Sequence, residues 1–307
     1  MERGYVGSAL TNLLERDGYN FKVYDKLLYE DDYMKSREFQ FGDIRDTDQV
    51  IKFCDDCGVV VLLAAIVGEP ACNINTETTR EINYEAIKNI CEKLPKDKHV
   101  VFISTCSVYG VNDQIVTEES PTNPISAYSI TKLNAETHVR ERGGTILRLG
   151  TVFGLAGNSA RLRSDLVVNT MTMNAFYNKK IVVNGGNQWR PLIAVKDVAE
   201  YILESCQNKY EGTFNLAYKN MTIEDIGKTV YSFFAQDCEI EIAEDPTDKR
   251  DYSVSAAKAL ELFFHEPEHT IEKEIEGLKK VLTEGRIKNI KCSKYSNIAH
   301  LKKEWSL

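Results

Sequence analysis

The sequence lacks any apolar run close to the roughly 20 residues that a membrane-spanning helix requires. Its longest such run, VVVLLAAIV at residues 59–67, is typical instead of a strand buried on both faces. Basic residues are also in deficit, because 38 Lys and Arg stand against 46 Asp and Glu and give a net charge of −8. That balance argues against a nucleic-acid partner. The start shows no signal-peptide pattern, so we expect neither a membrane protein nor a secreted one.

Metal-binding patterns are missing as well. Cys54 and Cys57 form a C-x-x-C pair, but neither a second pair nor a histidine pair lies at zinc-like spacing. The eight cysteines are otherwise scattered, and a chain of 307 residues can bury a core without disulfides. The composition therefore predicts reduced thiols in a cytoplasmic protein with no metal site.

Strands and helices alternate in the first half of the chain. Strands are predicted at residues 21–25, 38–44, 59–65, 99–105 and 145–150, and helices at about 8–17, 81–94 and 126–142, with another ending near 57. This order predicts an α/β fold with a doubly wound parallel sheet, which binds ligands at the carboxyl ends of its strands. We assign residues 1–150 to a dinucleotide-binding domain.

The second half is less regular. Helices are predicted at 161–178, 222–235 and 270–282, and two short strands and a helix at 180–206. Thr222 and Thr270 each open a helix with a Glu two residues later. We assign 151–285 to a smaller substrate-binding region, and the lysine-rich 286–307 to a C-terminal tail, either solvated or an appended helix.

The most informative absence lies at the start. Gly4 and Gly7, followed by an apolar helix, are typical of the end of a glycine-rich dinucleotide loop. There Gly4, Tyr5, Val6 and Gly7 would approach a pyrophosphate that faces the helix N-terminus. Such a loop normally follows a buried strand, and none precedes Gly4. In a G-x-x-G-x-x-G pattern, Met1 occupies the position of the first glycine; an accidental pair of glycines is the alternative.

Candidates for the rest of a dinucleotide site end the following strands. Asp25 lies about 20 residues after the glycines, where a carboxylate binds ribose hydroxyls and repels a 2′-phosphate, so NAD is favoured over NADP. A turn residue is the alternative for Asp25. The other candidates are the adenine-side Asp43 and Ile44, the strand end at Leu63, Ala64 and Ala65, and Asn83 on the next helix.

Tyr128 and Lys132 are the strongest catalytic signal. They are four residues apart on a predicted helix and therefore share a face. The ammonium is expected to lower the pKa of Tyr128, which would make it a general base near neutral pH. Thr105 ends the preceding strand and can donate a hydrogen bond to the same substrate oxygen, whereas we interpret Tyr109 as a packing residue.

The chain resembles the extended short-chain dehydrogenases/reductases, and within them the NAD-dependent epimerase/dehydratase family that acts on nucleotide sugars. The resemblance is carried, in chain order, by Gly4, Gly7, Asp25, GDI, LAA, STCSVYG and the Y-x-x-x-K pair. It covers about residues 4–280. It implies a Rossmann-like sheet, tightly held NAD that is recycled in each turnover, and a homodimer. It also implies Thr105, Tyr128 and Lys132 as the catalytic residues.

The resemblance further implies a nucleotide-sugar site. It places Asn169 beside the diphosphate and Cys106 and Ser107 at substrate-binding positions. For Cys106 the two interpretations are an acid/base in epimerisation and a small buried hydrophobic residue. Arg190 and Arg250 fall in segments that carry phosphate-binding arginines, and two guanidinium groups suit a diphosphate by geometry and charge. Surface ion pairs for the arginines and helix capping for Asn169 are the alternatives.

Two departures from the family pattern bear on the reaction. The family's 4,6-dehydratases have Asp-Glu directly after the catalytic Thr, where this chain has Cys106 and Ser107, and the usual His of "IHV" is Ala194. Without the carboxyl pair, that dehydration is not expected. We predict an NAD-dependent nucleotide-sugar epimerase acting through a transient keto-sugar. A keto-reductase or dehydratase of the same family and a non-catalytic dinucleotide-binding protein are the alternatives.

The family pattern also locates the missing strand. Its first strand lies at the middle of the sheet, between the strands predicted at 21–25 and 59–65. Without it, two rows of backbone groups lose their partners, at about 1–3 kcal/mol for each buried group left unsatisfied. We therefore expect either that the sequence lacks part of its natural N-terminus or that the sheet is rearranged.

Overall fold

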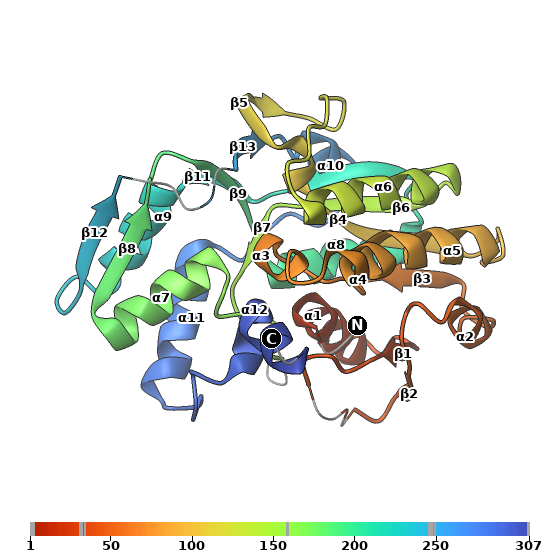
Figure 1. Cartoon of the computed structure of the whole chain (residues 1–307), viewed down its shortest axis with the longest axis horizontal. Coiled ribbons are helices and arrows are strands. Elements are labelled where there is room, and N and C mark those ends of the chain that lie inside the picture. Colours follow the sequence, from red (N-terminus) through yellow and green to blue (C-terminus); the bar gives the residue numbers. More distant parts are fainter. Residues whose placement is uncertain are drawn as a thin grey trace.

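A parallel sheet between two layers of helices forms the larger part of the molecule, and a smaller lobe lies beside it (Figure 1). The computed structural model describes residues 4–30, 33, 35–157, 160–244, 248 and 250–305. Met1 lies outside the described residues. The central strands run in the order β10 (Gly212–Leu216), β6 (Thr145–Leu149), β4 (His99–Thr105) and β3 (Val59–Leu62), and neighbouring strands are parallel. The predicted doubly wound fold is confirmed, although the strand predicted at 59–65 ends at Leu62.

Helices cover both faces of this sheet. One face packs against α1 (Tyr5–Arg16) and α8 (Val195–Asn208), and the other against α5 (Ala86–Lys93) and α6 (Ala127–Glu141). Apolar residues of the sheet therefore enter two cores, which explains why every residue of β6 is buried. The helix predicted at 81–94 begins earlier, as the consecutive segments α4 (Thr76–Arg80), the π-helical η1 (Glu81–Glu85) and α5.

The sheet is broken where the sequence predicts a missing strand. β1 (Lys22–Asp25) and β2 (Glu38–Phe41) form a separate parallel pair. Within the described residues, β1 pairs only with β2 and β3 only with β4, so no strand joins β1 to β3. Both strands, together with α2 (Thr47–Phe53), line one largely apolar cavity of about 150 Å³.

The smaller lobe has its own core. A mixed sheet of β7 (Thr151–Phe153), β9 (Trp189–Ala194) and β11 (Lys219–Thr222) lies next to the parallel pair β8 (Lys180–Asn184) and β12 (Glu239–Ala243). Apolar side chains from these strands pack against α7 (Val167–Asn178), α9 (Ile223–Ser232) and α11 (Ile271–Thr283). Thr222 and Thr270 cap α9 and α11 as expected, because their side chains accept from Asp225 N and Lys273 N. The helix predicted at 161–178 begins only at Val167.

Short segments connect the two parts. The 3₁₀ turn η2 (Cys106–Tyr109) follows β4 directly, and β5 (Val111–Val116) pairs in parallel with β13 (Asp251–Val254). This pairing brings Arg250, which precedes β13, beside η2. Two further helices are α3 (Glu69–Cys72), after β3, and α10 (Ala257–Leu262), after β13.

The chain ends in a docked helix. After the turn η3 (Ser293–Tyr295), α12 (Asn297–Glu304) packs on α3, and Leu301 is fully buried beside Tyr29 and Ile66 (Figure 1). Of the two sequence-based alternatives for 286–307, the structure has the appended helix. Among the helices of the described segments, none has both the length and the apolar character that crossing a membrane requires.

Candidate functional site

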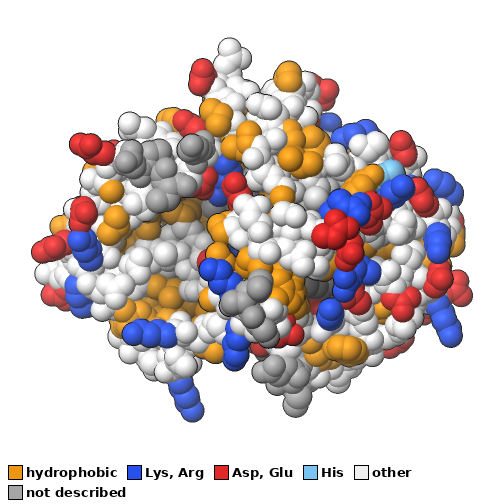
Figure 2. Space-filling view, in the orientation of Figure 1, with side chains coloured by type: hydrophobic (Ala, Val, Ile, Leu, Met, Phe, Trp, Pro, Cys, Tyr) orange, Lys and Arg blue, Asp and Glu red, His pale blue; other side chains and the backbone are white. Residues whose placement is uncertain are grey.

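A cleft of about 1170 Å³ lies between the large sheet and the smaller lobe. Its lining includes the carboxyl ends of central strands, at Leu63, Ala65, Thr105 and Leu149. The first turns of α1, α6 and α7 also line it, and helix N-termini favour anionic ligands. Figure 2 shows the hollow between the two lobes, with hydrophobic side chains inside it. This is the edge at which doubly wound sheets bind their ligands.

Tyr128 and Lys132 both line the cleft, as the sequence predicts for a shared helix face. The helix that carries them starts at a fixed point, because Ser126 and Ser129 form a reciprocal capping box. The ammonium of Lys132 is buried and lies 4.0 Å from the centre of the Phe102 ring. Thr105, the last residue of β4, lines the cleft with them, and its side chain acts to lower the pKa of Tyr128. The three predicted catalytic residues are therefore together.

The protonation of this group differs from the prediction. Burial raises the pKa of Tyr128, although the hydrogen bond with Thr105 and the charges of Arg163 and Arg250 oppose that rise. Burial also lowers the pKa of Lys132 to about 7, against the attraction of Glu136. The expectation that Lys132 lowers the pKa of Tyr128 is therefore wrong for the cleft as it stands. Desolvation is stronger here than the charge pairing that the spacing suggested.

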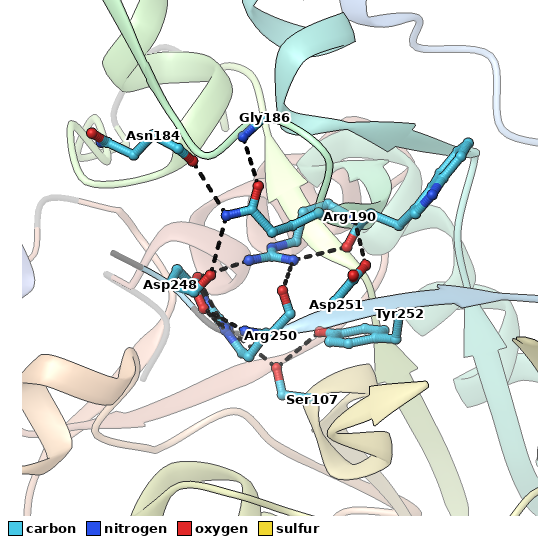
Figure 3. Close-up of polar contacts among 10 residues, drawn as sticks. Ser107, Asn184, Gly186, Arg190, Asp248, Arg250, Asp251 and Tyr252 are labelled. Carbon is cyan, nitrogen blue, oxygen red and sulfur yellow. Dashed lines mark hydrogen bonds and ion pairs between the residues drawn. The ribbon is translucent and has the colours of Figure 1, made fainter. Parts of the chain in front are cut away.

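Arg190 and Arg250 both line the cleft and meet at Asp248 (Figure 3). Arg190 Nη2 lies 3.1 Å from Asp248 Oδ2, and Arg250 Nε donates to Asp248 Oδ1 at 2.9 Å. Arg250 Nη1 also donates to Ser107 Oγ at 3.3 Å, and Ser107 Oγ is 3.0 Å from Tyr252 OH. The carboxylate of Asp248 thus pairs with two guanidinium groups. Burial opposes ionisation of Asp248, but the arginines hold its pKa well below the usual range.

The predicted cofactor residues divide between the cleft and the smaller cavity at the sheet break. Gly4, Tyr5, Val6 and Gly7 line the cleft. The N-cap residue Gly4 has no side chain with which to cap the first N–H groups of α1. Asp25, Asp43, Ile44 and Ala64 line the cavity, whereas Leu63 and Ala65 line both. The two spaces therefore adjoin, as an extended dinucleotide requires. The uncapped helix start fits a pyrophosphate.

The two carboxylates predicted to lie at the adenosine side, Asp25 and Asp43, already have partners. Asp25 is buried and accepts from Leu27 N at 2.8 Å. Asp43 lies 2.9 Å from Lys26 Nζ and 2.8 Å from Arg45 Nη2. Burial works against ionisation of Asp43, but these cations hold its pKa well below the ordinary value. Both carboxylates are therefore held in place before any ligand binds.

Three predicted site residues have other roles. Cys106 does not line the cleft. It is fully buried, and its thiol donates to Arg148 O at 3.1 Å; burial also raises the pKa of this thiol. Asn169 is buried as well, accepting from Gly154 N at 3.0 Å and donating to Arg163 O at 3.0 Å. Asn83 bonds both backbone groups of Ile66, accepting at 2.8 Å and donating at 2.9 Å. Each of the three stabilises backbone near the site, and none contacts the cleft directly.

The sequence interpretation missed several residues of the cleft. Arg161 and Arg163 line it from the loop between β7 and α7, and Asn297 lines it from the start of α12. The arginines were assigned to a helix, although their spacing of two places both side chains on one side of an extended segment. Asn297 had no signal in the sequence, because its position depends on how the C-terminal helix docks.

The fold and the cleft together define a class. A doubly wound sheet, an uncapped helix start at its ligand-binding edge and a Tyr–Lys pair beside a Thr are the features of a dinucleotide-dependent enzyme that moves protons and hydride. A model of the NAD dependent epimerase/dehydratase family matches residues 2–217. The chain belongs to that family, an NAD-dependent family of enzymes.

Curated relatives are consistent with this assignment. The chain is 27% identical over 220 residues to an N-acetyl-alpha-D-glucosaminyl-diphospho-ditrans,octacis-undecaprenol 4-epimerase from Escherichia coli O157:H7, covering 68% of this chain and 62% of the relative. It is 28% identical over 228 residues to a putative UDP-glucose 4-epimerase from Methanocaldococcus jannaschii, covering 68% and 72%. The matched segment thus spans less than two thirds of the Escherichia coli protein.

Solved structures share the fold. A UDP-glucose 4-epimerase from Thermotoga maritima, solved with UDP-glucose, superposes with a TM-score of 0.79 at 22% identity, covering 92% of this chain and 97% of that one. A UDP-glucuronic acid 4-epimerase from Bacillus cereus, in complex with UDP-glucuronic acid and NAD, gives 0.76 at 22% identity, with coverage of 92% and 97%. At this identity the likeness establishes the fold, and the chemistry has to be argued from the cleft.

Proposed function

We propose that the protein is an NAD-dependent epimerase of nucleotide sugars that acts through a transient keto-sugar. The supporting observation is that Thr105, Tyr128 and Lys132 line the same cleft as Arg190 and Arg250. The first group suits a sugar hydroxyl, and the second suits a diphosphate. The relatives named above are by name 4-epimerases of diphosphate-linked sugars, an undecaprenyl diphosphate sugar in one case and UDP-glucose in the other, which supports epimerisation of a sugar diphosphate.

The protein's own groups would handle the substrate and its proton. Bound NAD would supply a hydride acceptor that returns the hydride within one turnover. Tyr128, as tyrosinate, would take the proton of the sugar hydroxyl when the keto-sugar forms, and would return it when the hydroxyl is restored in the opposite configuration. Thr105 orients the oxygen by a hydrogen bond. Because burial raises the pKa of Tyr128, its ionisation depends on nearby positive charge, of which Arg163 and Arg250 supply part.

The residues after Thr105 favour epimerisation over 4,6-dehydration. Cys106 points away from the cleft, and Ser107 is hydrogen-bonded to Arg250 and Tyr252. Neither side chain supplies the carboxyl acid and base that loss of water needs. The proposal therefore has no elimination step.

The decisive measurement is turnover of the NAD-loaded protein on a panel of UDP-, dTDP-, GDP- and CDP-sugars, with epimers separated by chromatography. Tyr128→Phe should lower kcat by about 10²–10⁴-fold, because it removes the general base. Tyr177→Phe, at an exposed position of α7, is the matched control. Full turnover by Tyr128→Phe would overturn the mechanism. NADH accumulating in step with product would indicate a keto-sugar oxidoreductase instead.

A non-catalytic dinucleotide-binding protein is the second candidate. The break between β1 and β3 and the raised pKa of Tyr128 favour it. Calorimetry with NAD, together with the turnover assay, separates the two candidates. The non-catalytic candidate predicts NAD binding without turnover of any sugar in the panel.

The proposal extends to a cytoplasmic homodimer working in carbohydrate biosynthesis. Ile130 on α6 is 44% exposed and offers an apolar contact on the helical layer through which such pairing is expected. Light scattering on the purified protein measures its mass in solution. A monomeric mass at micromolar concentration would contradict the dimer without affecting the proposed chemistry.

A further inference from the structure

Two arginines that are not part of the diphosphate site described above lie buried against the same cleft. Arg161 and Arg163 are 4% and 7% exposed, and both line the cleft together with Gly4 and Gly7 of α1. Both belong to the loop between β7 and α7, which is not helical. Buried guanidinium groups at a ligand-binding edge require anionic partners.

Within the described part of the chain, the anionic partners of the two arginines are incomplete. Arg163 Nε lies 2.6 Å from Asp165 Oδ1. Arg161 lies over the Tyr29 ring, with its guanidinium carbon 4.1 Å from the ring centre, and its Nε has no hydrogen-bond partner among the residues that the structure describes. Burial and the repulsion of Arg163 lower the pKa of Arg161 to about 10, against the attraction of Tyr29, Asp165 and Glu30. An additional negative charge in this part of the cleft would therefore stabilise the pair.

The end of the chain holds these arginines in place. Arg161 Nη2 donates to Asn297 Oδ1 at 2.7 Å, and Arg161 Nη1 donates to Lys294 O at 2.5 Å. Asn297 N donates to Asp165 Oδ2 at 2.9 Å, and Asn297 Nδ2 donates to Val67 O, in the loop after β3, at 2.9 Å. Asn297 is thus a bridge between the arginine loop and the edge of the sheet.

Two further contacts complete the arrangement. His300 Nε2 lies 2.6 Å from Leu28 O, in the loop after β1. Asn169 Nδ2 donates to Arg163 O from behind the loop. The segment 293–304 therefore touches the loops that follow β1 and β3, both of which border the cofactor side of the cleft.

Arg163 interacts electrostatically with the first turn of α1. Its charge lowers the pKa of Tyr5, in the first turn of α1, and that of Tyr128, in each case against a larger effect of burial. The positive charge of Arg163 therefore affects both the first turn of α1 and the catalytic Tyr128. The start of α1 supplies uncapped N–H groups to the same cleft.

We propose that Arg161 and Arg163 form the second half of a site for the diphosphate of the bound dinucleotide, opposite the start of α1. The C-terminal segment 293–304 holds the two arginines in position. Asn297 is a positioning residue in this arrangement. The inference rests on the NAD dependence within the proposed function. The diphosphate of a nucleotide sugar shares the same chemistry, so the experiment includes both ligands.

Calorimetric titration of the full chain with NAD, and separately with UDP, tests the proposal. Arg163→Gln should raise the Kd for NAD about tenfold to hundredfold, since it removes charge-assisted hydrogen bonds, with a smaller effect on UDP. Arg163→Lys should recover part of the affinity, and Asn297→Ala should weaken NAD binding severalfold. Arg80→Gln, an exposed arginine on α4, is the matched control.

The outcomes are distinct. An unchanged Kd for NAD in Arg163→Gln overturns the inference and leaves the proposed function intact, and a larger loss for UDP than for NAD assigns the arginines to the substrate. If wild type binds no NAD, both the inference and the proposed function fail. Should the variants not fold, hydrogen exchange of the wild type decides. NAD should slow amides at 161–165 and 293–304, and protection confined to the start of α1 overturns the inference.

Discussion

Lys132→Met should make the protein more stable at neutral pH, although it removes a residue of the proposed catalytic group. Burial lowers the pKa of Lys132 from its ordinary 10.5 to about 7, so the folded state disfavours the ammonium that the unfolded chain retains. Between pH 7 and 10.5 the unfolded state therefore binds more protons, and this group makes stability rise with pH. At pH 7 the penalty is about 4 kcal/mol, and about 2 kcal/mol of it is relieved by pH 9.

Urea unfolding at pH 7 and pH 9 measures this effect. Wild type should gain about 2 kcal/mol relative to Lys132→Met over that interval, while other titrating groups cancel in the comparison. The variant loses a cation–π contact with Phe102, worth roughly 0.5–2 kcal/mol, so its net gain at pH 7 is smaller than the full penalty. Lys228→Met, at an exposed position of α9, is the control and should leave the pH dependence unchanged. Parallel pH profiles for wild type and Lys132→Met would refute the reasoning.

Three further substitutions test the surroundings of the cleft. Asn83→Ala leaves both backbone groups of Ile66 without their partner and should lower the free energy of unfolding by about 2–4 kcal/mol in urea titrations. Arg148→Met leaves the fully buried Glu136 without the guanidinium Nη2 that lies 2.6 Å away, and should lower the free energy of unfolding by about 3–5 kcal/mol. Adding Glu136→Leu should restore part of this stability, as measured by thermal unfolding. Cys106→Ala should keep kcat within about twofold in the epimer assay, because the thiol does not line the cleft; a loss of kcat comparable to that of a general base would show otherwise.

Local patterns predict the elements that position the catalytic group. The strand at His99–Thr105 has the bounds expected from its apolar run, and α6 starts where Ser126 can cap it. Because the helical repeat fixes positions four apart on one face, the sequence placed Tyr128 and Lys132 together. Those statements need no knowledge of the rest of the chain.

Tertiary contacts decide what the sequence did not predict. The protonation of Lys132 depends on which groups cover it, and spacing along a helix contains no information on desolvation. Cys106 follows Thr105 in the chain, yet the 3₁₀ turn directs its thiol to Arg148 O. Arg161 acquires its position from Asn297, which is more than a hundred residues away in sequence. Such contacts exist only after distant segments have packed.

The break between β1 and β3 leaves two parallel backbone edges facing one cavity inside the protein. An ordinary sheet edge offers an incoming strand a single ladder of hydrogen bonds. An extended apolar segment that enters here would pair on both sides at once and also bury its side chains against α2. Among the described residues no strand occupies this position, so a strand from another chain would find hydrogen-bonding partners inside the sheet as well as at its outer rim.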